Sequence, residues 1–380
     1  MKRFTFFIIS IIAFVSTALC SDIKLLNAGI AFAGVQSGEN NIVKRFPYSS
    51  FYAKYNDLNQ YLAERISKFK KEGYSFVTED LGSVRENTVS MAFVVDAEKH
   101  FISYIEGINQ YKLEVFVAAE ILLFDFRTKT ILATYPFMVS CSDLFKTKPG
   151  EENIQAMYSN IFGKKSCVIN GVNINIFDYF FQVLSQIEIK RSYSSTVGIT
   201  TVDVHSTTES NLRSIGFPDN DSAKTFMVNV FSANLYKNFK TPLVPYSYEN
   251  SEIFYAMATG YKEADKLSND LILKTPKSTY KITLKLNTLD YKKEDGRRGI
   301  NKCIFTGKYD ILVHDIENEK LFGKRISSGK SIVLTDLNRD QEMFNTELFY
   351  TLILLNQNVA KRLSYESSFK IFKDIMEKCK

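Results

Sequence analysis

A pattern of strand, charged turn and return strand occurs twice in the sequence, and it constrains the fold more than any other feature. The first copy is residues 120–133, EILLFDFRTKTILA, and the second is residues 310–323, DILVHDIENEKLFG. Aligned without gaps, the copies share three identities: Ile121 with Ile311, Leu122 with Leu312, and Asp125 with Asp315. Apolar edges on both sides of a charged turn are typical of a β-hairpin. We expect Asp125 and Asp315 to cap these turns through backbone hydrogen bonds.

The segments around the two hairpins also correspond. Each copy begins with a short apolar strand (29–35 and 225–231) and continues into a helix with apolar residues at helical spacing (51–71 and 251–270). Each then supplies a strand before the hairpin (112–118 and 280–289) and closes on a second helix (174–189 and 339–363). This order predicts an α/β (α+β) fold of two similar β-α-β-β-β-α sandwich domains with mixed sheets. Chance similarity of two common hairpins is the alternative.

The duplication and the composition of the intervening chain suggest the domain boundaries. Residues 21–190 form the first α/β domain and residues 223–380 the second, which suits the length of the chain. Between them, residues 191–222 are rich in Ser, Thr, Asn and Asp and are expected to be a polar linker. The apolar alternation from Val197 to Val204 within this linker could add an edge strand to the first domain.

The start of the chain is typical of a secretory signal peptide. Met1-Lys2-Arg3 precedes an apolar run that ends near small residues, and we expect residues 1–20 to be cleaved. The apolar core is short compared with the roughly 20 residues of a membrane span, so removal is favoured over an uncleaved anchor. Lipoprotein anchoring through Cys20 is disfavoured, because the large Leu19 precedes it. The predicted location is therefore secreted or periplasmic, in the cell envelope or outside it.

Four cysteines remain after residue 20: Cys141, Cys167, Cys303 and Cys379. An even number in an exported chain suggests disulfides, and four cysteines allow three pairings. Pairing Cys141 with Cys167, and Cys303 with Cys379, would close one loop within each domain and contribute ~3–4 kcal/mol per bridge by loop-entropy arguments. Four free, buried thiols are the alternative.

The positive charge of the chain is concentrated in one stretch. The net charge is +6, and between Lys274 and Lys302 nine Lys or Arg face three acids. The candidate basic binding surface is Lys285, Lys292, Lys293, Arg297, Arg298 and Lys302. It could meet an acidic partner or an envelope surface, including peripheral contact with a membrane, or it could be only the solvated face of strands. No RNA-binding signature accompanies it, so nucleic acid is not an expected partner.

Motifs for catalysis are weak. The stretch GKRISSGKS, residues 323–331, resembles a phosphate-binding loop, but five residues rather than four separate its glycines. The apolar run from Ile332 that follows predicts a short strand rather than a helix, so we expect a polar loop or hairpin end. Asp203 and His205 would share one face of a strand, without the further ligands of a metal site. His314 is expected to be a structural strand residue. We predict no catalytic, cofactor-binding or metal-binding residues.

The two hairpins resemble a known family. The motifs ILLFDFRTKTI, residues 121–131, and ILVHDIENEKL, residues 311–321, are similar to the α/β domain shared by the N-terminal domain of TolB, the curli-secretion lipoprotein CsgG and the lipoprotein activators of penicillin-binding proteins. The turns lack the glycine usual in that family, and its lipobox is not matched at Cys20. The resemblance implies a non-catalytic envelope protein that binds other proteins.

One other class of function fits the sequence. An exported hydrolase could be built from acids scattered along the chain. A deep pocket lined by two or more acids with shifted pKa would favour this alternative, and a shallow surface without such a cluster would favour the binding protein.

Overall fold

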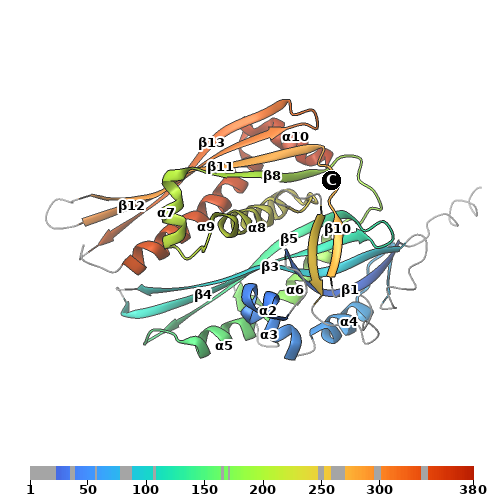
Figure 1. Ribbon diagram of the computed structural model, residues 1–380, viewed down its shortest axis with the longest axis horizontal. Coiled ribbons are helices and arrows are strands. Elements are labelled where there is room, and N and C mark those ends of the chain that lie inside the picture. The colour runs from blue at the N-terminus through green and yellow to red at the C-terminus, as the bar shows by residue number, and fades with distance from the viewer. Residues whose placement is uncertain are drawn as a thin grey trace, which may run out of the picture.

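The computed structural model describes residues 23–34, 39–55, 58–77, 88–105, 108–163, 167–169, 172–246, 252–257, 270–294, 301–334 and 341–380. These residues form a mixed α/β fold of four layers, in which two sheets alternate with two layers of helices (Figure 1). The predicted fold class, α/β with mixed sheets, is confirmed. The predicted signal peptide, residues 1–20, lies outside the described residues.

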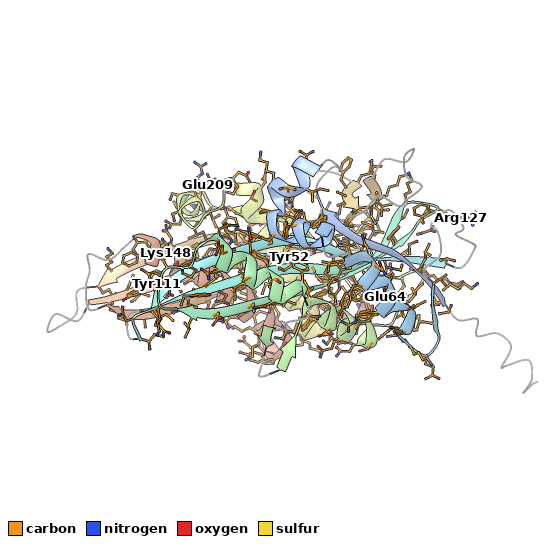
Figure 2. The ribbon with its side chains drawn as sticks, turned by 90° about the horizontal axis from the view of Figure 1, so that it is seen from below. Tyr52, Glu64, Tyr111, Arg127, Lys148 and Glu209 are labelled. Atoms are coloured by element: carbon orange, nitrogen blue, oxygen red, sulfur yellow. The ribbon has the colours of Figure 1, made fainter. Side chains whose placement is uncertain are left out.

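The larger sheet has seven strands in the order β2-β1-β3-β4-β5-β10-β9. Its strands are β1 (Ile23–Ala33), β2 (Tyr74–Val77), β3 (Thr88–Ile105), β4 (Gln110–Asp125), β5 (Thr130–Phe145), β9 (Glu252–Met257) and β10 (Asp270–Lys274). Its outer face is covered by α2 (Glu39–Arg45), α3 (Pro47–Tyr55), α4 (Leu58–Lys68), α5 (Glu151–Phe162) and α6 (Ile176–Gln186). Figure 2 looks onto this layer, where the Tyr52 hydroxyl of α3 donates to the Gln155 carbonyl of α5 at 2.8 Å. A short ribbon, β6 (Cys167–Ile169) with β7 (Val172–Ile174), joins α5 to α6.

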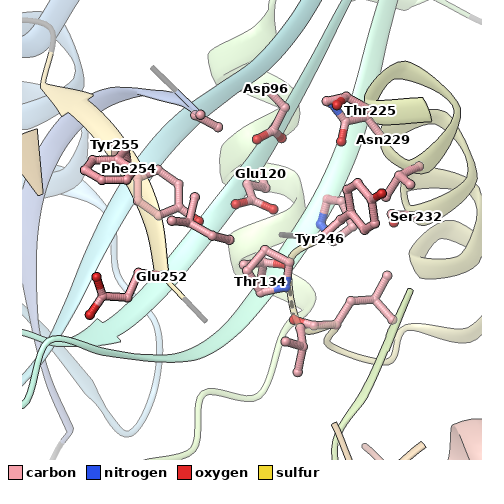
Figure 3. Close-up of a pocket in the computed structure, with 18 of the residues that line it drawn as sticks. Asp96, Glu120, Thr134, Thr225, Asn229, Ser232, Tyr246, Glu252, Phe254 and Tyr255 are labelled. Carbon is pink, nitrogen blue, oxygen red and sulfur yellow. Dashed lines mark hydrogen bonds between the residues drawn. The ribbon is translucent and has the colours of Figure 1, made fainter. Parts of the chain in front are cut away.

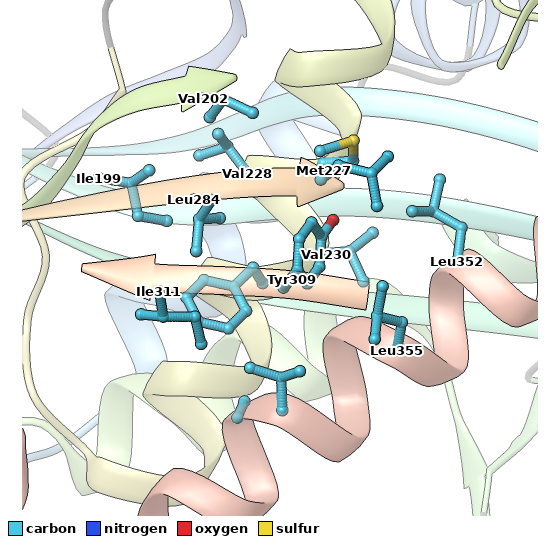
Figure 4. Packing of buried hydrophobic residues seen from close by; sticks show 14 of the residues in the cluster. Ile199, Val202, Met227, Val228, Val230, Leu284, Tyr309, Ile311, Leu352 and Leu355 are labelled. Carbon is cyan, nitrogen blue, oxygen red and sulfur yellow. The ribbon is translucent and has the colours of Figure 1, made fainter. Parts of the chain in front are cut away.

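The smaller sheet has four strands in the order β13-β12-β11-β8. They are β8 (Val197–Val204), β11 (Tyr280–Glu294), β12 (Asn301–His314) and β13 (Lys320–Leu334). Between the sheets lie α8 (Asn220–Phe239) and α9 (Gln341–Tyr365), and α7 (Ser206–Ser214), η4 (Ser367–Phe369) and α10 (Lys370–Lys378) complete this half. Apolar side chains of β8, β11, β12, α8 and α9 make one core (Figure 4).

The two sheets share one strand connectivity. In the larger sheet β1 pairs parallel with β3, which continues antiparallel into β4 and β5. In the smaller sheet β8 pairs parallel with β11, which continues antiparallel into β12 and β13. Helices connect the parallel strands in both, and a helix follows the last strand of each. The predicted order β-α-β-β-β-α is therefore present in each sheet, but the first strand of the second unit is β8.

Both predicted hairpins form, and their aspartates cap the turns as expected. Asp125 Oδ1 accepts hydrogen bonds from the backbone N–H groups of Arg127 at 2.8 Å and Thr128 at 3.2 Å. Asp315 Oδ1 accepts one from Glu319 N at 2.8 Å. An aspartate that bonds its own turn is a common way to fix a hairpin end.

The strand predicted at residues 225–231 is wrong, because these residues belong to α8. This helix lies between two sheets, and ten of its twenty residues are buried on several sides. Because buried apolar residues lie on several sides of α8, they give no one-sided periodicity, and Thr225–Phe231 looks like a buried strand in the sequence. The local signal was its cap, since Asp219 accepts a hydrogen bond from Ser222 N at 2.6 Å.

The helix predicted at residues 251–270 is also wrong. Its described parts form β9 and β10, which pair antiparallel with each other. The edge strand predicted at Val197–Val204 exists, but it pairs with β11 of the second unit rather than with the first domain. The stretch 323–331 is neither a loop nor a hairpin end, because it lies inside β13, paired along its length with β12.

Candidate functional site: a polar cavity between the sheets

The larger sheet closes on itself at one end. β9 pairs with β1 through Ala31–Ala33 and Tyr255–Met257, and β10 pairs with β5 at Lys274 and Thr130. The strands β1, β3, β4, β5, β10 and β9 thus form a ring. Its interior is apolar, with Ala92, Leu122 and Tyr255 among the buried residues. Small side chains such as alanine on β1 and β3 leave room for β9 and β10 to cross over the sheet.

A cavity of about 260 Å³ lies where this ring meets α8. Its wall is formed by β3, β4, β5, β9, α8 and the segment after α8 (Figure 3). The polar side chains that line it are Arg45, Asp96, Glu120, Thr134, Thr225, Asn229, Ser232, Tyr246, Glu252 and Tyr255. A cavity with several convergent polar groups is the usual form of a ligand site.

Two acids point into this cavity from neighbouring strands. Glu120 lies on β4 opposite Val94 of β3, and Asp96 follows at a bulge where the pairing passes from Val95 to Ala97. Because the bulge adds a residue to β3, Asp96 is set beside Glu120 on the inner face of the sheet. Only 8% of Asp96 and 5% of Glu120 is exposed. Figure 3 shows their carboxyl groups next to each other.

Burial and mutual repulsion hold a proton on this pair. Burial raises the pKa of Glu120 to about 8, although a hydrogen bond from Thr134 opposes the shift. Burial raises the pKa of Asp96 well above its usual range, the Glu120 charge raises it further, and the Arg45 charge lowers it. Two carboxyl groups that share a site cannot both ionise cheaply, so we expect the pair to retain a proton at neutral pH.

Two further polar side chains of the cavity wall are Tyr255 and Asn229. Tyr255 is 1% exposed and lines the cavity, where the charges of Glu120 and Asp96 act on its hydroxyl. The amide nitrogen Nδ2 of Asn229 is buried and has no partner in the described part of the chain. A buried polar group without a partner costs roughly 1–3 kcal/mol. An unpartnered donor of this kind in the wall makes the cavity suited to a polar ligand.

Arg45 stands at the mouth of the cavity. Its guanidinium Nη1 donates to the Gly34 carbonyl at 2.9 Å, and the side chain is exposed. It acts on Asp96 and on Asp219 at the start of α8 through space. Gly34 has φ +67° and a Cβ there would lie 3.0 Å from the Arg45 nitrogen, so glycine lets the two approach.

The segment after α8 ties the two sheets together beside the cavity. Thr134 of β5 and Leu243 exchange backbone hydrogen bonds of 2.8 and 2.9 Å, and Val244 N donates to the Val197 carbonyl of β8 at 2.9 Å. Leu243 and Val244 also line the cavity. The cavity is therefore built at the junction of the two sheets.

The residues of the candidate basic surface do not gather at this cavity. Lys285 pairs with Asp203 at 3.2 Å and Lys292 with Glu294 at 3.4 Å. Lys293 lies over the Phe344 ring at 4.4 Å. Lys302 is exposed on β12, and Arg297 and Arg298 lie outside the described residues. The described lysines thus follow β11 and β12, and a binding role for them stays a prediction.

The predicted pairing of Cys303 with Cys379 is not formed. Both are free, buried thiols. Cys303 lies within the electrostatic reach of Lys293 and Glu347, whereas Cys379 lies beside Leu132 and Tyr193. Both thiols lie in the second unit, Cys303 on β12 and Cys379 at the end of α10.

Cys141 on β5 is bonded in a disulfide. β6, which begins at Cys167, packs against β5, but the Cys167 side chain lies outside the described ones. The pairing of Cys141 with Cys167 therefore stays a prediction.

The histidines have local roles. His205 caps α7, with Thr207 N donating to its Nδ1 at 3.4 Å. His100 packs edge-on against the Tyr48 ring, with centroids 5.7 Å apart. Among the described residues no three His, Cys, Asp or Glu side chains are grouped to hold a metal ion. Asp203, predicted to share a strand face with His205, instead pairs with Lys285.

The cavity residues were missed because nothing in the sequence brings them together. Glu120 leads the first hairpin motif as Asp310 leads the second, so it was visible as an acid at the edge of an apolar strand. Asp310, in contrast, lies on the exposed face of its sheet and accepts two hydrogen bonds from Arg325, of 2.7 and 2.8 Å. Only the packing of α8 and β9 over the first sheet buries Glu120.

Comparisons with known proteins do not identify a family. No family model matches the chain, and no curated protein matches it. Among solved structures, a minor lipoprotein from Acinetobacter baumannii aligns over 44% of this chain and 87% of its own at 6% identity, with a TM-score of 0.22. A neuraminyllactose-binding hemagglutinin homologue from Helicobacter pylori aligns over 44% and 84% at 12% identity, with a TM-score of 0.28. A DUF330 protein from Xanthomonas campestris aligns over 50% and 93% at 6% identity, with a TM-score of 0.24.

These similarities are partial and weak, and at such identities and TM-scores they do not carry a function to this chain. The described helices include none that is both long enough and apolar enough to span a bilayer.

Proposed function

We propose that this chain is an exported, non-catalytic binding protein of the cell envelope or secretion fluid. The proposal of export rests on the basic and apolar start of the sequence. The observation that carries the binding role is the cavity at the junction of the two sheets, whose wall holds a buried amide nitrogen, Asn229 Nδ2, without a partner in the described part of the chain. This nitrogen is already buried, so a ligand that accepts from it gains a hydrogen bond without a further loss of hydration.

The partners we expect include other proteins. The resemblance of the hairpins to the TolB and CsgG domain suggests them, and the lysines along β11 and β12 offer a surface for an acidic protein. Lys285 pairs with Asp203 and Lys292 with Glu294 at the surface, and such surface pairs contribute about 0–1 kcal/mol each. An acidic partner can therefore compete for them at little cost.

Affinity capture tests this proposal. We expect the immobilised mature chain to retain specific proteins from its native envelope or secretion fluid, identified by mass spectrometry. A variant with Lys285→Glu, Lys292→Glu and Lys302→Glu should lose any partner that docks on the basic surface. Lys293 is kept, because it packs on Phe344. If the native chain and the variant capture the same proteins equally, the basic surface is not the docking site. If the native chain captures no specific protein, binding to other proteins is contradicted.

A second candidate is an exported hydrolase, and one observation favours it. Asp96 and Glu120 are two acids with raised pKa in one cavity, which is the arrangement expected of a general acid and its partner. A hydrolase would lose its turnover on Glu120→Gln while keeping its fold.

A further inference from the structure

The cavity holds two carboxyl groups whose charge nothing in its wall compensates fully. Asp96 has no hydrogen-bond partner among the described residues, and no described cation lies within ion-pair distance of either acid. Arg45 acts on Asp96 only through space, from the exposed mouth. Burying a carboxylate without a nearby cation costs free energy, and a buried carboxyl group usually avoids this cost by taking up a proton. A bound cationic ligand would also neutralise the charge.

The other residues of the cavity wall indicate which kind of cation could bind there. A metal ion would need three or more side-chain ligands, and the described part of the chain groups none. The cavity instead mixes acceptors with apolar surface, since Val228, Leu243 and Ile253 line it beside the acids. An alkyl chain that ends in –NH₃⁺ matches both parts, because the ammonium has three donors and the chain packs on the apolar side.

We propose that this cavity binds a primary ammonium group, with Asp96 and Glu120 as its acceptors and Tyr255 as a further hydrogen-bond partner. This inference rests on the proposed binding function and names the class of ligand. The ammonium can come from a small aliphatic amine or from a lysine side chain of a peptide.

Binding of the ammonium group displaces the proton from the acid pair. The ligand enters as R–NH₃⁺, and the proton shared by Asp96 and Glu120 leaves to solvent, so no bond of the ligand is broken. The other titratable or charged groups that face the acids are Arg45 on α2, Glu252 and Tyr255 on β9, and Tyr246 after α8. The Tyr255 hydroxyl stays neutral at pH 6–8.5, because burial and the two acids raise its pKa well above its usual range. Over this range the exchange therefore depends chiefly on the acid pair.

Calorimetric titration of the full mature chain with n-pentylammonium chloride tests the proposal. Affinity should rise by up to tenfold per pH unit between pH 6 and pH 8, with proton release seen as a dependence of the heat on buffer ionisation. n-Pentanol, the uncharged analogue, should bind at least tenfold more weakly at pH 8, without dependence on pH. Nα-acetyl-lysine amide is the second arm, and tighter binding of it than of pentylammonium would assign the site to lysine side chains.

Variants keep the test specific. Glu120→Gln and Asp96→Asn should each lower the affinity for pentylammonium at pH 8 at least tenfold, whereas Glu188→Gln, at a side chain 76% exposed, should leave it unchanged. Circular dichroism would confirm that each variant folds. Pentylammonium and pentanol binding equally, or binding that ignores both acids, would overturn the ammonium assignment and leave the cavity as a site for neutral ligands.

A different set of results would reject the proposed binding role itself. Ser232→Phe should fill the cavity from α8. If this variant binds pentylammonium and pentanol as the native chain does, and if the native chain also captures no proteins, then both the ligand class and the binding role are wrong. If neither probe binds but protein capture succeeds, only the ammonium inference is lost.

Discussion

Replacing Glu120 by glutamine should stabilise the folded chain above pH 8 by about 3–5 kcal/mol. The pKa of Glu120 is raised from 4.5 to about 8 in the fold, and each tenfold change in the affinity of a group for its proton corresponds to about 1.36 kcal/mol. The unfolded chain loses this proton near pH 4.5 while the folded chain keeps it to about pH 8. The wild type should therefore lose stability as the pH rises from about 4.5 to about 8. Glutamine is neutral throughout and can still accept from Thr134.

Chemical denaturation at pH 5, 7 and 8.5 measures this effect. The stabilisation by Glu120→Gln should be small at pH 5 and largest at pH 8.5. Asp310→Asn is the matched control, since Asp310 holds the equivalent position in the second hairpin. A hydrogen bond from Arg325 lowers the pKa of Asp310, so this substitution should destabilise, with the effect fading as the pH falls through the lowered value. A stabilisation by Glu120→Gln that does not change with pH would contradict the acid pair.

Replacing Phe349 by alanine should destabilise the whole chain by about 3–5 kcal/mol, the usual cost of removing a large buried aromatic ring. Phe349 is fully buried on α9. Its ring lies 5.8 Å from Phe116 of the larger sheet and 5.4 Å from Phe226 of α8, and it stacks on Phe101 of β3. It thus links the helices of the second unit to the sheet of the first.

Because this aromatic cluster joins both units, the loss of stability in Phe349→Ala should appear as a shift of a single unfolding transition. Denaturation followed by far-ultraviolet circular dichroism and by calorimetry should shift as a single step. Leu354→Ala on the same helix, at a side chain 36% exposed, should cost less than about 1 kcal/mol. Two separate transitions, of which Phe349→Ala shifts only one, would show that the sheets unfold independently.

The sequence predicted local structure better than the way the two units meet. The hairpins, their aspartate caps and α9 were visible because their patterns are local: an apolar strand on each side of a charged turn, and a helical stripe from Phe344 to Val359. The residues around α8 were misjudged for a tertiary reason. Phe226, Met227 and Val230 are buried on more than one side of α8, so the apolar residues of this helix do not follow a single stripe.

The repeat explains why one acid is buried in a cavity and the other is not. In each unit the helices cover one face of the sheet, and Glu120 and Asp310 both lie on the other face. In the second unit that face carries polar residues such as Thr283, Lys285 and Arg325, and Asp310 stays in an exposed ion pair. In the first unit α8 and the crossing strand β9 cover it, which buries Glu120 beside Asp96. Asp96 and Glu120 lie on neighbouring strands, but the elements that bury them, α8 and β9, begin only at Asn220 and Glu252, and no motif in the sequence marks this contact.

The carboxyl groups themselves offer the most direct test of the cavity as a charged ligand site. In ¹³C-detected NMR titration of the side-chain carboxyls of the ligand-free chain, assigned with Asp96→Asn and Glu120→Gln, the pair should retain a proton through neutral pH, and the pKa of Glu120 should be about 8. Addition of n-pentylammonium should bring both groups to the ionised form at pH 7. Two carboxyls that are already ionised below pH 5 without ligand would contradict the proposed site.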